Sequence, residues 1–210
     1  YWVREAGIDG YRCDAAAMAP TAFWNEALIN LDSIRPVIKL AEAWEPELLA
    51  NGFDAAYGWE FHHLLNDIAK GTKNITDIEK YIAKADTLYA PDDMLMNFIT
   101  NHDENSWAGT EYERMGDHVK GFAALTYLMP GIPMIYNGQE SGLNKRLRFF
   151  EKDTIPWNDT TLFSFYRKLN LLKQQNPSLG AGISAGELHF KADSVTRAAT
   201  LYKKHKKNSV

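Results

Sequence analysis

Three carboxylates, Asp14, Glu42 and Asp103, each come at the end of a short apolar run, and basic side chains lie beside two of them. Arg12 precedes Asp14 by two residues, and His102 directly precedes Asp103. A strand that is buried on both faces excludes charge, so an acid in this position belongs at the end of the strand. One such acid is equally well explained as the N-cap of the next helix, but three in successive units favour a shared pocket.

Glycoside hydrolysis requires this set of groups. A retaining enzyme needs an ionised carboxylate as nucleophile and a protonated carboxyl as general acid, ~5–5.5 Å apart. Arg12 and Asp14 are two residues apart and point to the same side of a strand, where the guanidinium favours ionised Asp14. Glu42 follows an apolar run and lies beside Trp44, and desolvation there would suit a general acid.

Short apolar runs alternate with helical patterns along most of the chain. Strands are expected at residues 10–14, 37–41, 53–57, 95–100 and 132–136. Helices are expected at residues 21–31, 59–70, 76–89, 119–129 and from 161 to the Asn-Pro pair at 176–177. This alternation favours a parallel α/β sheet, either doubly wound or closed as a (β/α)8 TIM barrel. No G-x-G-x-x-G or Walker pattern is present, and carboxylates at several strand ends suit a barrel.

Polar residues mark the starts of three of these helices. Thr21 and Asp117 are expected to be N-caps, and Thr76 with Glu79 has the form of a capping box. Each of these predictions pairs a side chain with a free N–H group of its own helix.

The sequence texture changes after about residue 178. Gly180, Gly182 and Gly186 surround two β-like runs at 187–190 and 195–202. We therefore expect barrel structure over residues 1–180 and the beginning of a truncated, antiparallel all-β C-terminal domain over residues 181–210.

Composition excludes several classes of protein. The 210 residues are 45% hydrophobic and 24% charged, which is typical of a folded chain. The net charge of −4 argues against a nucleic-acid partner, which requires a basic face. No apolar run approaches the ~20 residues of a membrane span. The single Cys13 excludes an internal disulfide framework and leaves the localisation undecided.

Four segments of the chain have the form of known strand motifs: residues 7–14 (GIDGYRCD), 40–44 (LAEAW), 98–103 (FITNHD) and 131–140 (GIPMIYNGQE). In this order they resemble the fourth-, fifth-, seventh- and eighth-strand motifs of the α-amylase family of glycoside hydrolases. The resemblance implies about strands four to eight of a (β/α)8 barrel, followed by the start of the C-terminal β domain.

The resemblance also implies a role for each charged residue. Asp14 matches the nucleophile and Glu42 the general acid/base, in agreement with the roles argued from their surroundings. Asp103 matches the third carboxylate, which binds sugar hydroxyls and stabilises the oxocarbenium-like transition state. Arg12 matches the arginine that orients the nucleophile, and His102 matches a histidine that binds the sugar.

Three further residues are candidates for substrate binding. Asn101 belongs to the same motif as His102, and Trp44 and Tyr57 follow strand ends, where aromatic rings can stack on sugars. Core or rim packing explains the two rings equally well. Trp107 has the same two interpretations.

The chain departs from the family pattern after the nucleophile. Many members carry Lys-His where this chain has Ala17 and Met18. In many amylases that histidine also helps to bind a structural calcium whose other ligands precede the fourth strand. The resemblance therefore implies no metal or cofactor in this chain and leaves calcium open for a full-length protein.

Other polar residues have competing interpretations. His62 and His63 diverge by about 100° on a helix, which disfavours a shared metal. Cys13 is expected to face the barrel exterior under a helix. Gln139 and Glu140 suit either the pocket lining or a turn cap.

The expected function is a retaining α-glycosidase acting on α-1,4-linked glucans such as starch and maltooligosaccharides. Alternatives are a transglycosylase, branching or α-glucosidase-type enzyme on the same scaffold, or an inactive glucan-binding fragment. A whole barrel takes ~250 residues, so the N-terminal half of the barrel is expected to be a missing partner of this chain. Because a half-barrel exposes sheet edges, we expect residues 1–210 alone to be inactive or poorly folded.

Overall fold

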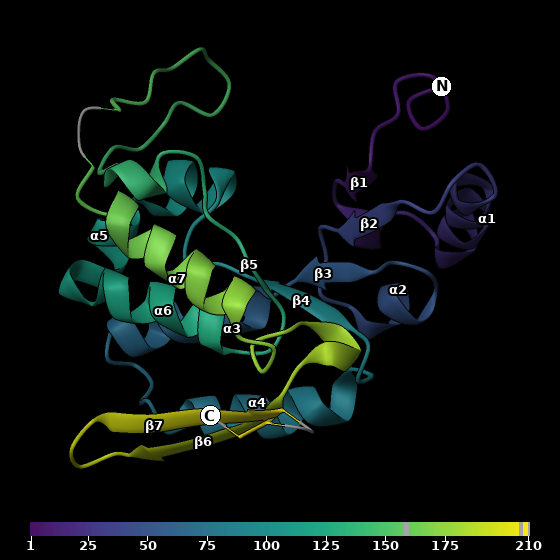
Figure 1. The fold of residues 1–210 in the computed structure, drawn as a ribbon. Helices are drawn as coiled ribbons and strands as arrows, with labels where there is room; N and C mark the ends of the chain where they lie inside the picture. Colours follow the sequence, from purple (N-terminus) through teal and green to yellow (C-terminus); the bar gives the residue numbers. More distant parts are fainter. Residues whose placement is uncertain (158–159, 206–207, 210) are drawn as a thin grey trace.

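A five-stranded parallel sheet forms the centre of the molecule (Figure 1). The computed structural model describes residues 1–157, 160–205 and 208–209. The strands follow the chain order across the sheet, as consecutive barrel strands do: β1 (Gly10–Cys13), β2 (Ile38–Ala41), β3 (Ala55–Tyr57), β4 (Met94–Asn97) and β5 (Ile132–Pro133). All four strand pairs are parallel, so the carboxyl ends of the strands lie along one edge.

Helices connect these strands and cover the sheet. The longer ones are α1 (Thr21–Asp32), α3 (Trp59–Ala69), α4 (Asp77–Leu88), α6 (Val119–Leu128) and α7 (Phe163–Gln175), and all five were predicted. The short elements are η1 (Ala16–Met18), α2 (Pro46–Ala50), the π-helical turn η2 (Glu104–Ala108), α5 (Glu111–Met115), η3 (Gly116–His118), η4 (Gln139–Ser141) and η5 (Gly182–Ser184). The sequence pattern missed them because each is too short to display a helical period.

A separate antiparallel sheet follows α7. It contains β6 (Glu187–Asp193), β7 (Ala198–His205) and β8 (Asn208–Ser209). Figure 1 shows the β6–β7 hairpin alongside α4, and the backbone N–H of Ala192 donates to Glu79 Oε1 at 2.7 Å. The predicted antiparallel runs are confirmed, and this contact ties them to the helical layer.

Thr76 is the N-cap residue of α4, but none of the three predicted capping hydrogen bonds forms. Pro20 is the N-cap of α1, and the Thr21 hydroxyl instead donates to Glu47 on α2 at 2.9 Å. Neither Asp117 nor Thr76 makes a capping hydrogen bond, and the Glu79 carboxylate binds β6. For Thr21 and Glu79, a partner in another element replaces the helix N–H group that the local pattern had assigned to the side chain.

A complete capping box forms at a place that was not predicted. The Thr110 hydroxyl accepts from the Glu113 N–H at 3.2 Å, and Glu113 Oε2 accepts from the Thr110 N–H at 2.7 Å. This box starts α5, a helix too short to be recognised from its apolar spacing.

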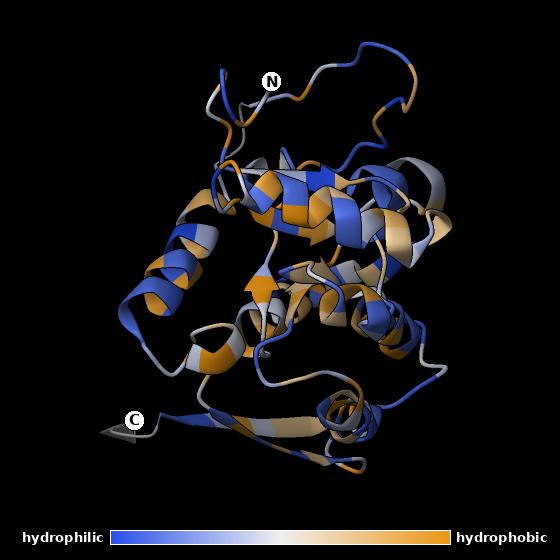
Figure 2. Cartoon of the chain, turned by 90° about the vertical axis from the view of Figure 1, so that its right-hand side faces the viewer, coloured by the Kyte–Doolittle hydropathy of each residue, from blue (hydrophilic) through white to orange (hydrophobic). Residues whose placement is uncertain are grey.

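Two of the three apolar clusters among the described residues pack helices against the sheet. One joins α3, α4, α5, α6 and α7 and includes Phe61 and Leu65, both 0% exposed. The other lies between the first strands and α1 and includes Ala41 and Ala56. Burying a side chain such as Phe61 contributes about 1.5–3 kcal/mol, so apolar packing is enough to anchor α3 behind the sheet. Figure 2 shows the hydrophobic colouring of the central strands.

The fourth and fifth strands are shorter than predicted. β4 ends at Asn97 and β5 at Pro133, and the N–H of Met134 donates to the Asn97 carbonyl at 2.9 Å where the ladder stops. The motif residues 98–103 therefore lie in the segment that leaves the sheet.

Among the described residues, no helix is both long and apolar enough to cross a membrane.

Candidate active site

One guanidinium connects two of the predicted catalytic carboxylates. Arg12 Nη1 pairs with Asp14 Oδ1, Arg12 Nη2 lies 2.9 Å from Glu42 Oε1, and Arg12 Nε donates to the Tyr57 hydroxyl at 3.3 Å. The sheet register causes this meeting, because Arg12 on β1 lies opposite Leu40 on β2, two residues before Glu42. Residues at the ends of β1, β2 and β3 thus form one connected set of hydrogen bonds and ion pairs around Arg12.

The charge of Arg12 is strongly held. Partial burial disfavours the charged guanidinium, but the hydrogen bonds to Tyr57 and Asp14 outweigh it and raise the pKa of Arg12 above its ordinary value. The guanidinium also lies 5.7 Å from the centre of the Tyr57 ring. Arg12 is therefore a permanent cation between the two acids.

Glu42 is held more firmly than Asp14. The Glu42 side chain is 16% exposed, and its Oε2 accepts from the Ala15 N–H at 2.7 Å while Oε1 faces Arg12. Ala15 has φ 42° and ψ 46°, a left-handed conformation that is strained for a residue with a Cβ and is often found at functional sites. The Asp14 side chain is 82% exposed, which leaves it open to an incoming ligand.

A second polar group follows β4. His102 Nε2 lies 3.4 Å from Asp103 Oδ2, and the His102 ring stacks on Phe149 at 5.9 Å. Trp107 is 62% exposed and packs against Phe149 at 5.1 Å. Burial, with a contribution from the charge of Asp103, raises the pKa of Tyr136 after β5. A cluster of aromatic rings, His102, Trp107 and Phe149, therefore lies next to Asp103 in this segment.

The two groups lie at the same edge of the sheet and are separated by one strand. β3 lies between β2 and β4, so the strands that carry Glu42 and Asp103 are about 10 Å apart if neighbours are spaced by about 4.8 Å. The structure brings Arg12, Asp14 and Glu42 into direct contact and holds His102 and Asp103 as a separate pair.

The three other predicted substrate-binding residues differ in exposure. Trp44 is 47% exposed after β2, whereas Tyr57 is 4% and Asn101 is 1% exposed. Asn101 Oδ1 accepts from the Glu104 N–H at 2.8 Å, which fixes the turn into η2. Of the three side chains, only Trp44 is open to solvent; Tyr57 is buried against Arg12, and Asn101 is buried in the turn after β4.

Several alternatives from the sequence are resolved by the contacts. Cys13 packs against the α1 side of the sheet, as expected, and burial raises the pKa of its thiol. Gln139 caps the turn after β5, because its Oε1 accepts from the Tyr136 N–H and its Nε2 donates to the Tyr166 hydroxyl. The ring planes of His62 and His63 are 61° apart, and both rings pack against Trp59.

No metal-based step follows from these residues. Within residues 1–157, 160–205 and 208–209, no three His, Cys, Asp or Glu side chains are placed to hold one ion.

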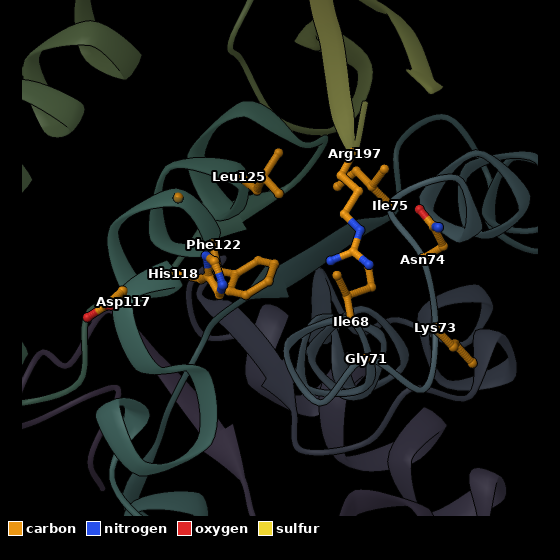
Figure 3. Close-up of a pocket in the computed structure, with 11 residues that line it drawn as sticks. Ile68, Gly71, Lys73, Asn74, Ile75, Asp117, His118, Phe122, Leu125 and Arg197 are labelled. Carbon is orange, nitrogen blue, oxygen red and sulfur yellow. The ribbon is translucent and has the colours of Figure 1, made fainter. Parts of the chain in front are cut away.

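A cavity of about 550 Å³ lies away from both polar groups (Figure 3). It is enclosed by the α3–α4 loop, the start of α6 and the β6–β7 turn, from which Arg197 reaches toward Ile68. None of the predicted site residues lines this cavity.

Sequence reasoning missed the contacts of four polar side chains behind the second group, of which His62 alone had been considered, as a metal ligand. His62, Asn66, Glu104 and Arg114 contact one another and the backbone after β4. The position of Glu104 directly after Asp103 was a usable signal. Arg114 gave none, because its partners are distant in the sequence.

Parallel strands in barrel order, with acids and an arginine at their carboxyl ends, define a glycosidase-type (β/α)8 scaffold. The family model for the α-amylase catalytic domain matches residues 1–162, and the chain belongs to this family of glycoside hydrolases. The predicted partial barrel, with the start of a C-terminal β region, is confirmed by this match and by the structural likeness below.

Similar proteins include amylases and a transferase. The chain is 27% identical over 205 residues to Alpha-amylase 2 of Dictyoglomus thermophilum, covering 87% of this chain and 35% of that protein. It is 27% identical over 173 residues to a 4-alpha-glucanotransferase of Thermotoga neapolitana, covering 76% and 38%. The solved structure of the noncanonic maltogenic alpha-amylase AmyB from T. neapolitana has a TM-score of 0.77 at 27% identity, covering 90% and 44%. The chain thus spans about a third of the length of these two curated relatives.

Proposed function

We propose that the protein containing this chain is a retaining glycosidase that hydrolyses α-1,4-linked glucans. The observation that carries the proposal is the sharing of Arg12 by Asp14 and Glu42, with a 2.9 Å contact to the latter. A guanidinium that touches both acids keeps them close together, as a retaining mechanism requires. The amylase relatives support an α-glucan as the substrate.

The chemistry proceeds in two displacements. Asp14 attacks the anomeric carbon while Glu42 donates its proton to the glycosidic oxygen, so the glycosidic bond breaks and a glycosyl ester forms on Asp14. Glu42, now a carboxylate, accepts a proton from water, and the resulting hydroxide attacks the anomeric carbon and releases Asp14. The Ala15 N–H and Arg12 stabilise this carboxylate form of Glu42.

The group after β4 contributes binding rather than bond exchange. Asp103 and His102 are proposed to bind sugar hydroxyls and to stabilise positive charge in the transition state. The exposed Trp44 and Trp107 rings offer surfaces for the apolar faces of sugars. Asn101 and Tyr57 are proposed to hold this machinery from behind.

Transfer to a sugar acceptor is the second candidate function, and the glucanotransferase relative is the observation that favours it. The first displacement is the same, and an acceptor hydroxyl replaces water in the second. Maltoheptaose separates the two outcomes, because hydrolysis yields only shorter products and transfer also yields longer ones.

The proposal also includes the division of the chain and its partners. Residues 1–180 are assigned to the barrel and residues 181–210 to the beginning of a C-terminal domain. The barrel strands that precede the fourth are proposed to complete the site, and the acidic net charge of −4 argues against nucleic acid as a partner.

The test is Asp14→Asn in the complete protein that contains this chain. Amide at this position cannot act as the nucleophile, so turnover of maltoheptaose is expected to fall at least about 10⁴-fold while glucan binding persists. Isothermal titration with maltoheptaose measures the binding. Ordinary turnover by this variant would refute the assignment, and Asp9→Asn is the matched control, since Asp9 precedes the strand.

A further inference from the structure

A buried polar network lies behind the end of β4, where α3 and α5 pack. It consists of His62 and Asn66 on α3, Glu104 at the start of η2 and Arg114 on α5. The His62 side chain is 0% exposed and that of Arg114 is 6% exposed. None of these residues has a role in the reaction as described above.

His62 connects α3 to the turn that follows β4. Its Nε2 lies 2.8 Å from Glu104 Oε2, its Nδ1 lies 3.3 Å from the Phe98 carbonyl oxygen, and its ring stacks on that of Phe98 at 4.7 Å. Burial lowers the pKa of His62, and the hydrogen bond from His62 lowers the pKa of Glu104. The ionised Glu104 is an acceptor, so its contact with His62 requires the imidazole proton on Nε2, and Asn66 Nδ2 donates to the His62 carbonyl at 2.8 Å.

Arg114 connects the same turn to α5. Its Nη2 donates to the Ile99 carbonyl at 2.8 Å and its Nε donates to the Gly109 carbonyl at 2.9 Å. Its Nη1 donates to Asn66 Oδ1 at 2.6 Å and lies 3.9 Å from Glu104 Oε2. One guanidinium thus holds both ends of the segment between residues 99 and 109.

All of these backbone contacts fall in the segment 98–109. The network reaches its start at residues 98 and 99, its middle through the Glu104 side chain, and its end at residue 109. Asp103 lies inside this segment, directly before Glu104. The segment that carries Asp103 is therefore held at three points along its length: its start, its middle and its end.

Helix packing alone does not require these polar groups. Phe61, Leu65 and Met115 already bury α3 and α5 in one apolar cluster. Burying charged side chains is costly unless every hydrogen bond is made, so a core position would ordinarily be apolar. In addition, η2 is a π-helical turn, a form that occurs frequently at functional sites.

We propose that Glu104, held by His62 and Arg114, is a positioning residue that sets the orientation of Asp103 toward the sugar. The inference rests on the proposed function, in which Asp103 stabilises the transition state. Because Glu104 acts through Asp103, whose charge stabilises the transition state, its removal lowers the rate of the chemical step more than it weakens ground-state binding of the sugar.

The test is a double-mutant cycle on the complete protein with maltoheptaose as substrate. Glu104→Ala is expected to lower kcat about 10- to 100-fold with less than about a 3-fold change in KM. Glu104→Gln, whose amide oxygen still accepts from His62, is expected to restore kcat to within about 3-fold. In a protein that already carries Asp103→Asn, Glu104→Ala should cost less than about 2-fold, because its target is gone.

The controls separate positioning from general stability. Asp67→Asn removes a carboxylate from the same helix as His62, one that lies 3.7 Å from Lys73 on the surface, and should leave kcat unchanged. If Glu104→Ala does not fold, Arg114→Lys replaces it in the cycle, since an ammonium cannot reach residues 99 and 109 together. Equal losses with and without Asp103→Asn would overturn this inference alone. An unmodified protein without activity on glucans would overturn the proposed function and this inference with it.

Discussion

The ends of β1 and β4 carry two acids of the proposed active site, and these acids are supported in opposite ways. At β1, Asp14 is 82% exposed, and its contact is with Arg12, two residues away in the same motif. At β4, Asp103 lies in a segment fixed by buried side chains from α3 and α5. A short motif can therefore supply both an acid and the basic group that orients it. The position of a loop, in contrast, depends on side chains from helices distant in the sequence.

The two kinds of support differ in energy. Exposed ion pairs contribute about 0–1 kcal/mol to stability, so the Arg12–Asp14 pair serves orientation more than folding. Removing one partner of a buried hydrogen bond costs about 1–3 kcal/mol, so the His62–Glu104 hydrogen bond affects both orientation and stability. Variants at β1 should therefore lose activity without loss of stability, and variants at β4 should lose some of each.

Among the variants that test this difference between the two regions, the largest loss of kcat is expected from Glu42→Gln. The amide cannot donate the proton that the glycosidic oxygen needs, so kcat on maltoheptaose should fall about 10²–10⁴-fold. On an aryl glucoside, whose phenolate leaves without protonation, the loss should be smaller. Equal losses on both substrates would contradict the acid role. The melting temperature should stay unchanged.

A smaller loss is expected from Arg12→Lys. The ammonium keeps the charge but cannot contact Asp14, Glu42 and Tyr57 at once, so kcat should fall about 10- to 100-fold. Tyr57→Phe is the matched control, because it removes only the hydroxyl that accepts from Arg12 Nε at 3.3 Å. Its expected effect is a few-fold. An unchanged kcat in the Arg12→Lys variant would contradict the role of the guanidinium in orienting Asp14 and Glu42.

The smallest effect concerns stability on the β4 side. Glu111 on α5 is 2% exposed, neither of its carboxylate oxygens has a hydrogen-bond partner within the described residues, and burial raises its pKa to about 8. Between its ordinary value of 4.5 and about 8, the folded protein holds a proton that the unfolded chain releases. The free energy of unfolding should therefore fall as pH rises through this window.

Glu111→Gln is expected to remove that pH dependence. It should stabilise the protein by about 1–2 kcal/mol at pH 8 and by less at pH 5, measured by urea unfolding at both values. Glu113→Gln is the control on the same helix, because the hydrogen bond from Arg146 lowers the pKa of Glu113 to about 2, below this window. A gain from Glu111→Gln that is the same at both pH values would contradict the buried-acid interpretation.

Features that depend on contacts between nearby or adjacent elements could be predicted from the sequence, and features that depend on distant partners could not. The ends of β1 and β2 were accessible from sequence, because Arg12, Asp14 and Glu42 meet through adjacent parallel strands with a regular register. The helix caps were not, since Thr21 and Glu79 bind partners on α2 and β6. The burial of Tyr57 and Asn101 was also undetermined, because exposure depends on neighbours that pattern does not specify.

The sequence by itself determined the order of strands and helices, the acids at the strand ends and the family, because these depend on short-range periodicity and local motifs. Only the tertiary structure decided which side chains hold those acids. His62, Asn66 and Arg114 reach the segment after β4 from helices α3 and α5, and no local rule pairs residues so far apart in the chain. The physical reason is that a buried polar group takes whichever partner the packing brings within hydrogen-bond distance.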